Sequence, residues 1–175
     1  WSCPYLPRPP QRRHNRALSQ LRSKHAAMVD PRSPALRVLL VENDPDTQEV
    51  FRLFLAQCGH DVRTTSTVAG ALDAMAECRF DVLLADIGLA DGTGWDLMRE
   101  VGRRGVHRPG YAIAMSGYGM AADRARSLAA GFAQHLVKPV DLEAIEQQLE
   151  RASAKRAPCV LGMTLGRRCA FCGRS

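Results

Sequence analysis

Apolar and polar positions follow two different periods along residues 36–151. Five short runs are almost continuously apolar or β-branched, which favours strands of a covered sheet. They span residues 36–41, 61–65, 80–85, 111–115 and 133–137. Apolar residues recur at helical spacing in residues 46–57, 67–78, 93–103 and 121–130, and again after Asp141. Thr93 and Asp141 are the predicted N-caps of the third and fifth of these helices.

Five strand–helix pairs in strict alternation predict an α/β fold, a doubly wound five-stranded parallel sheet with helices on both faces. Ligands of such sheets bind beyond the carboxyl ends of the strands, near the point where the strand order reverses. The polar residues that follow the strands are therefore the first candidates for a functional site.

Polar side chains follow four of the five predicted strands. They are Glu42, Asn43 and Asp44 after the first strand, Asp86 after the third, Ser116 after the fourth, and Lys138 after the fifth. Taken singly, such residues are ordinary turn formers or surface charges. Together they would place carboxylates, a hydroxyl and an ammonium at one edge of the sheet. That combination suits a cation and a transferring phosphoryl group.

Four segments, in order, resemble the receiver domains of two-component response regulators, most closely the receivers attached to hybrid sensor histidine kinases. They are Val38–Thr47, Phe80–Gly92, Ala114–Gly119 and His135–Val140. The spacing of 30 residues from Asp86 to Ser116 and of 22 from Ser116 to Lys138 agrees with the family pattern. The resemblance covers about residues 36–151 and implies a (βα)5 flavodoxin-like receiver fold.

The resemblance also implies a phosphorelay function. Asp86 would be the phosphoacceptor, which takes a phosphoryl group from a histidine kinase or a histidine phosphotransfer domain, with Ser116 and Lys138 contacting that group. Mg²⁺ would be the cofactor, and its ligands would be Glu42, Asn43, Asp86 and the backbone carbonyl of Gly88. Ser116 and His135 would be the switch residues that signal to a downstream protein or attached domain, and a cis peptide bond is expected before Pro139.

Three positions depart from the family pattern. Asn43 stands where the family usually has a metal-binding Asp, Ala90 replaces a common Pro, and His135 replaces a common Tyr or Phe. The loss of a negative charge at Asn43 predicts weaker Mg²⁺ binding, unless Asp44 compensates. A degenerate receiver, acting as an interaction module without phosphorylation, is the alternative.

Two other functions are disfavoured. A phosphatase or hydrolase that uses Asp86 as nucleophile lacks a second acid two residues on, where Gly88 stands, and lacks an insertion that could house a substrate. A transcription factor is disfavoured because about 24 residues follow Arg151, too few for a helix-turn-helix domain. The expected class is a signalling domain and not an enzyme, apart from self-catalysed phosphoryl transfer and autodephosphorylation.

The net charge of +6 is unevenly distributed. Residues 1–37 carry +7, residues 38–150 carry −7 and residues 151–175 carry +6. We expect a basic Pro/Arg-rich tail or linker (1–35), a receiver domain (36–151) and a basic tail with three cysteines (152–175). Nucleic-acid binding is not expected, because no groove-reading helix accompanies the basic flanks. A zinc site is not expected at Cys169 and Cys172, because no second pair of ligands is present.

The first ten residues show neither a starting Met nor the pattern of a secretory signal. The sequence lacks an initiator Met, which indicates either a fragment or a wrongly assigned translation start, with Met28 as the alternative start. It also lacks the charged start and apolar stretch of a secretory signal, and no run of about 18 apolar residues occurs. A cytoplasmic location without a membrane span is therefore expected.

Overall fold

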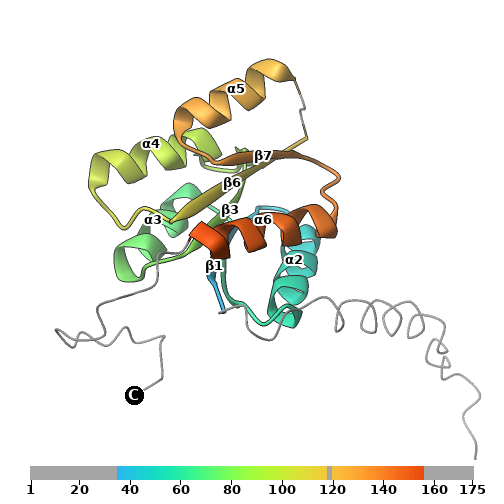
Figure 1. The fold of residues 1–175 in the computed structure, drawn as a ribbon. Helices are drawn as coiled ribbons and strands as arrows, with labels where there is room; N and C mark the ends of the chain where they lie inside the picture. The colour runs from blue at the N-terminus through green and yellow to red at the C-terminus, as the bar shows by residue number, and fades with distance from the viewer. Residues whose placement is uncertain (1–34, 118–119, 156–175) are drawn as a thin grey trace, which may run out of the picture. The chain divides into compact units, whose positions relative to one another are not determined.

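The computed structural model describes residues 35–117 and 120–155. The five predicted strands form one parallel sheet with the order β2-β1-β3-β6-β7 (Figure 1). The strands are β1 (Arg37–Val41), β2 (Asp61–Thr65), β3 (Val82–Asp86), β6 (Tyr111–Ser116) and β7 (Gln134–Val137). The order reverses between β1 and β3, which confirms the predicted doubly wound α/β fold.

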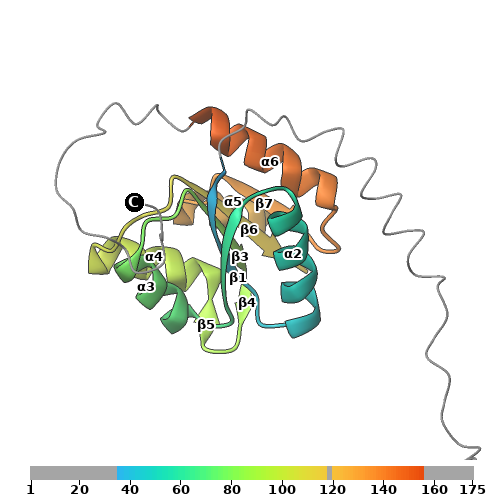
Figure 2. The ribbon, with the colours of Figure 1, turned by 90° about the horizontal axis from the view of Figure 1, so that it is seen from below.

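Helices cover both faces of this sheet (Figures 1 and 2). One face is covered by α2 (Pro45–Gln57) and α6 (Leu142–Lys155), and the other by α3 (Val68–Glu77), α4 (Gly94–Arg104) and α5 (Ala121–Ala130). Side chains alternate across a strand, so β1 supplies both apolar clusters. Val38 and Leu40 pack with α2 and α6, while Leu39 and Val41 pack with α3 and α4.

Side-chain hydrogen bonds stand at the two predicted N-caps, Thr93 and Asp141, and also at Asp44. The Thr93 side chain accepts a hydrogen bond from the backbone N–H of Asp96, and the Asp96 carboxylate accepts from the N–H of Thr93, which makes a reciprocal capping box for α4. Asp44 caps α2 through Thr47. Asp141 Oδ1 accepts from the N–H of Glu143 at 3.1 Å, next to the start of α6.

Two features differ from the elements expected from the sequence. The loop after Asp86 contains a short antiparallel pair, β4 (Gly88–Leu89) and β5 (Gly92–Thr93), in which Leu89 is buried and anchors the loop. In addition, α6 continues to Lys155, past Arg151, the predicted end of the domain. Ala152 extends the apolar stripe of α6 into the core, which explains the extra turn.

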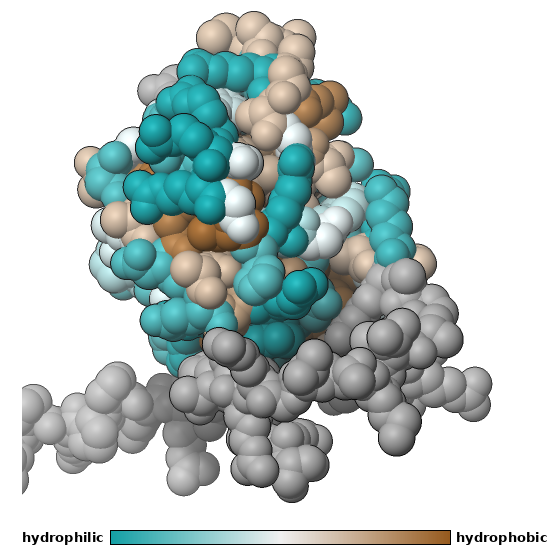
Figure 3. Space-filling model, turned by 90° about the vertical axis from the view of Figure 1, so that its left-hand side faces the viewer, coloured by the Kyte–Doolittle hydropathy of each residue, from teal (hydrophilic) through white to brown (hydrophobic). Residues whose placement is uncertain are grey.

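Polar side chains predominate on the face of the molecule in Figure 3, where they surround a smaller apolar area. In residues 35–117 and 120–155, no helix is both long enough and apolar enough to cross a membrane. Met28, Cys169 and Cys172 lie outside these residues.

Candidate functional site

The carboxyl ends of β1, β3 and β7 bring three of the predicted residues together. Glu42 directly follows β1, Asp86 ends β3, and Lys138 directly follows β7. Each of the three lies two residues after a leucine that packs with α2 and α6, namely Leu40, Leu84 and Leu136. Because side chains alternate across a strand, all three side chains point toward this same face. Strand register and alternation therefore gather groups that are up to 96 positions apart in the sequence.

One ammonium group contacts both carboxylates. Lys138 Nζ donates to Glu42 Oε2 at 2.7 Å and to Asp86 Oδ2 at 2.8 Å. Glu42 is 1% exposed and Asp86 8% exposed, so both carboxylates are largely withdrawn from water. Two carboxylates and one ammonium give this cluster a formal charge of −1, which favours an additional cation over an additional anion.

The protonation of Lys138 is reinforced by its surroundings. Partial burial by itself lowers the pKa of the ammonium, but the hydrogen bonds to Asp86 and Glu42, and the charges of these two carboxylates, together raise the pKa above 10.5. Lys138 is therefore a permanent cation near neutral pH.

The backbone around Asp86 is tightly fixed. Ile87 N–H donates to Met115 O at 2.8 Å, and Gly88 N–H donates to Asp86 Oδ1 at 3.2 Å. A Cβ atom added at Gly94, the first residue of α4, would lie 2.8 Å from the backbone carbonyl oxygen of Asp86. Only glycine allows α4 to begin this close to the end of β3.

Ser116 lies at the same edge of the sheet. It is buried at the end of β6 and follows Met115, the residue in register with Asp86 on the neighbouring strand. Its carbonyl oxygen accepts a hydrogen bond from Lys138 N–H at 2.8 Å, so the backbone links these two positions. The expected cis peptide bond between Lys138 and Pro139 is confirmed.

Asn43 and Asp44 have different roles. Asn43 is exposed at the rim of the site. Asp44 Oδ1 accepts from Thr47 N–H at 2.8 Å as the cap of α2, and hydrogen bonds from Thr47 lower the pKa of the Asp44 carboxyl. The Asp44 carboxylate is thus engaged by its own helix, which argues against its replacing the missing charge at Asn43.

The donor set at this edge suits a hard divalent cation. Glu42 and Asp86 supply carboxylate oxygens and lie close enough to share one ammonium, and the exposed Gly88 and Asn43 supply amide oxygens. Across the described residues, no group of three or more His, Cys, Asp or Glu side chains forms a metal site. Because Glu42 and Asp86 are the two carboxylates here, Mg²⁺ would complete its oxygen ligands with the amide oxygens of Asn43 and Gly88 and with water.

His135 lies inside the fold in a hydrogen-bonded set that the sequence did not reveal. The ring is buried on β7, and its Nδ1 lies 2.8 Å from Ser127 Oγ on α5. Trp95 Nε1, on α4, donates to the same oxygen at 2.9 Å. Trp95 and Ser127 were missed because each lies on a separate helix and neither belongs to a recognisable motif.

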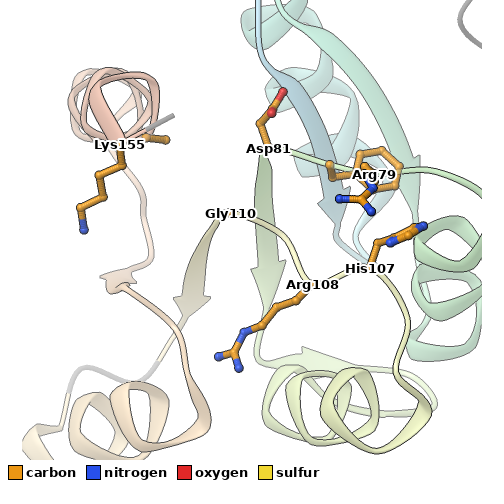
Figure 4. Close-up of a pocket in the computed structure, with 8 residues that line it drawn as sticks. Arg79, Asp81, His107, Arg108, Gly110 and Lys155 are labelled. Carbon is orange, nitrogen blue, oxygen red and sulfur yellow. The ribbon is translucent and has the colours of Figure 1, made fainter. Parts of the chain in front are cut away.

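A pocket of about 310 Å³ lies at the opposite edge of the sheet (Figure 4). Arg79 and Asp81 line it before β3, Gly110 lines it before β6, and Lys155 lines it at the end of α6. The length of β3, about 16 Å, separates this pocket from Asp86. The pocket is therefore distinct from the candidate site.

Comparison with known proteins gives the family. The sequence model of the response regulator receiver domain family matches residues 38–150. The response regulator protein PilR of Pseudomonas aeruginosa is 32% identical over 123 residues, and the match covers 70% of this chain and 27% of PilR. The transcriptional regulatory protein KdpE of Mycobacterium tuberculosis is 34% identical over 120 residues, which cover 68% of this chain and 51% of KdpE. The chain thus spans between about a quarter and a half of these relatives.

Solved receiver structures share the fold. The non-phosphorylated HemR receiver domain of Leptospira biflexa has a TM-score of 0.63 and 27% identity, and the match covers 70% of this chain and 98% of that one. The receiver domain of sensor histidine kinase PA1611 of P. aeruginosa, with a magnesium ion in its active-site cleft, has a TM-score of 0.61 and 26% identity, with 69% and 99% covered. From residue 38 to residue 150, the chain belongs to the response regulator receiver domain family.

Proposed function

We propose that this domain accepts a phosphoryl group on Asp86 and thereby switches a protein-interaction surface in a two-component phosphorelay. The observation that carries the proposal is the shared contact of Lys138 Nζ with Glu42 and Asp86 at the carboxyl edge of the sheet. Membership of the receiver family supports it.

The chemistry is a displacement at phosphorus. An Asp86 carboxylate oxygen attacks the phosphorus of a phosphohistidine, the P–N bond breaks as the P–O bond forms, and the imidazole leaves with the bonding electron pair and takes a proton. Lys138 would stabilise the negative charge on the transferred phosphoryl group, because its ammonium already contacts Asp86 Oδ2. Ser116, at the end of the adjacent strand, would donate its hydroxyl to a phosphoryl oxygen.

Mg²⁺ is the proposed cofactor, and it would neutralise charge on the phosphoryl oxygens when bound. Glu42, Asp86, Asn43 and the carbonyl of Gly88 would hold it. The Glu42 carboxylate is held in position by two hydrogen bonds. Asp44 N–H donates to its Oε1 at 3.1 Å, and Lys138 Nζ donates to its Oε2. The net charge of −1 at this cluster is a further reason for a cation to precede an anionic phosphodonor.

The proposed partners are a histidine kinase or a phosphotransfer domain upstream, and an attached or separate output domain downstream. A sensor histidine kinase, RcsC of Salmonella typhi, is among the relatives, at 25% identity. On α2, which begins beside Glu42, the apolar side chains of Val50 and Leu53 are exposed three positions apart. This exposed pair suits docking of a partner helix near the site. A cytoplasmic location is part of the proposal, because the phosphoryl groups of such kinases come from ATP.

Phosphorylation by a small phosphodonor tests the proposal. The full chain, Asp86→Asn and Asp73→Asn would each be incubated with acetyl phosphate and Mg²⁺, then separated on a phosphate-affinity gel. Asp73 is exposed on α3, so its variant makes the same chemical change away from the site. We expect a retarded band for the wild type and Asp73→Asn and none for Asp86→Asn. Absence of the band in all three proteins at saturating Mg²⁺ would favour the degenerate receiver. That alternative is considered because Asn43 replaces a usual metal-binding Asp.

A further inference from the structure

The pocket of about 310 Å³ at the opposite edge of the sheet gathers positive charge from separate segments. The last turn of α6 lies beside the starts of β3 and β6, because the helices of a parallel sheet run back toward the strand starts. Arg79 precedes β3, Arg108 precedes β6, and Lys155 ends α6. In Figure 4, Lys155 and Arg79 stand on opposite sides of Gly110. Three cations therefore line one cavity.

This lining has a net positive charge. Asp81 is the carboxylate of the lining, so three cations and one anion give a formal charge of +2 with His107 neutral. Asp81 Oδ2 already accepts a hydrogen bond from Arg37 N–H at 2.8 Å. In residues 35–117 and 120–155, no carboxylate forms an ion pair with any of the three cations. Positive charge without a carboxylate partner favours an anion from outside the domain.

Complementing helix dipoles accounts for only part of this charge. Lys155 lies in the last turn of α6, where a cation is favourable for the helix itself. Arg79 and Arg108 lie outside the helices, so the dipole gives no reason for their positions. Arg103 and Arg104, in the last turn of α4, pair with Glu100 and do not line the pocket.

Contacts within the fold hold two of the cations in place. Lys155 Nζ lies 5.0 Å from the centre of the Tyr111 ring, and Tyr111 Oη donates to Gln148 Oε1 at 3.1 Å. Arg108 Nη2 donates to the carbonyl oxygen of Gly131 at 3.4 Å. A binding group that is positioned beforehand loses less conformational entropy when a ligand arrives.

The remaining lining and the size of the pocket indicate a small ligand with an apolar part. Phe80 and Ala152 are 8% and 6% exposed, and Gly110 adds no side chain. Small-molecule sites measure roughly 300–1,000 Å³, so this pocket is at the small end of the range. Residues 1–34 carry seven basic residues against one acid (+6), and residues 156–175 carry four against none (+4). Charge therefore disfavours either flank as the occupant.

We propose that this pocket binds a phosphate monoester of a small organic molecule. A phosphate monoester carries a charge of about −1.5 to −2 near pH 7, which matches the +2 of the lining. Guanidinium forks and an ammonium are strong donors to phosphoryl oxygens, and the organic part would rest against Phe80 and Ala152. A monoanionic carboxylate would leave one positive charge uncompensated. This site is independent of phosphoryl transfer to Asp86, which lies about 16 Å away.

Phenyl phosphate is a suitable probe, because it joins a dianionic phosphoryl group to a small apolar body. The full chain, labelled with ¹⁵N, would be titrated with it at about pH 7 and about 50 mM salt, without Mg²⁺. Amide chemical shifts then locate the ligand. We expect the amides of Phe80, Arg108, Gly110 and Ala152 to shift together and to give a single Kd.

Charge-removing variants test which side chains hold the probe. Arg79→Gln and Lys155→Gln should each raise the Kd about fivefold to tenfold, because each removes a charged donor from the pocket. Arg124→Gln is the matched control, since Arg124 is exposed on α5 and does not line the pocket. Its Kd should change by less than about twofold. Inorganic phosphate and benzoate, titrated in the same way, should both bind more weakly than phenyl phosphate.

Several outcomes would overturn the proposal. Shifts confined to residues outside the pocket would place the probe elsewhere. Equal weakening in Arg124→Gln would mean that only the overall charge of the chain attracts it. Equal affinity for inorganic phosphate would remove the role of the organic part, and equal affinity for benzoate would remove the match to a dianion. The phosphodonor assay at Asp86 bears on neither result, so the two proposals can fail separately.

Discussion

A single ammonium group serves two carboxylates at the candidate site. Lys138 divides its hydrogen bonds between Glu42 and Asp86, so neither carboxylate has a full counter-charge to itself. Asn43 contributes no charge, and Asp44 is engaged as a helix cap. The proposed binding of a divalent cation would therefore depend on few groups, and each can be changed separately.

Restoring a carboxylate at position 43 is expected to strengthen Mg²⁺ binding. Asn43→Asp adds a charged ligand at the rim, and we expect its Kd for Mg²⁺ to fall by about tenfold. Asp44→Asn is the matched control, because Asn caps a helix as well as Asp does and the change removes one charge nearby. It should alter the Kd by no more than about twofold. Titration calorimetry measures both, and a large loss in Asp44→Asn would mean that Asp44 is itself a ligand.

A partly buried histidine, His60, predicts how stability depends on pH. Burial lowers the pKa of His60 below 6.5, and its Nδ1 accepts from Leu36 N–H at 3.3 Å. Below about pH 6.5 the unfolded chain takes up this proton more readily than the folded chain. The contribution to stability is therefore complete above that pH and is lost as the pH falls through the folded pKa.

Urea unfolding between about pH 7 and pH 5 measures this effect. The free energy of unfolding should fall toward pH 5, and His60→Asn should flatten the dependence. His107→Asn, at an exposed histidine, is the control and should leave the slope unchanged. Equal slopes for the wild type and His60→Asn would show that other groups cause the pH dependence.

At the scale of single elements, the start of α4 is the most completely capped helix terminus near the site. Thr93 and Asp96 exchange reciprocal hydrogen bonds there, and Gly94 and Trp95 follow. Thr93→Val removes the hydroxyl at nearly constant volume, and we expect it to lower the free energy of unfolding by about 1 kcal/mol. Thr93→Ser retains the hydroxyl and should remain near the wild type. Denaturant midpoints distinguish the two, and equal losses would mean that the methyl group and not the cap matters.

The elements themselves were largely readable from the sequence. Apolar runs and helical spacing predicted every strand of the parallel sheet, because local pattern and burial agree there. The β4–β5 pair was missed, since its two-residue strands are too short to show a period. The positions of Glu42, Asp86 and Lys138 followed from strand ends. The sharing of one ammonium and the Trp95–Ser127–His135 contacts did not, because they depend on side-chain directions between distant elements.

At the scale of the whole molecule, the described residues contain both apolar clusters and the candidate site. They carry seventeen Asp and Glu against thirteen Arg and Lys, a formal charge of −4 for residues 35–155, whereas the full chain is +6. A fragment of residues 35–155 is expected to unfold in one cooperative transition. Its Tm should lie within about 3 °C of that of the full chain, a shift that corresponds to less than about 1 kcal/mol. A non-cooperative melt by calorimetry would show that the core needs the flanking residues.

The contact between Gly94 and the Asp86 carbonyl oxygen limits how this family member can diverge. A side chain at position 94 would meet that oxygen and push α4 and β3 apart. Under the proposed function, adaptation of Asp86 to a new donor protein would therefore proceed through neighbouring positions, with glycine retained at position 94.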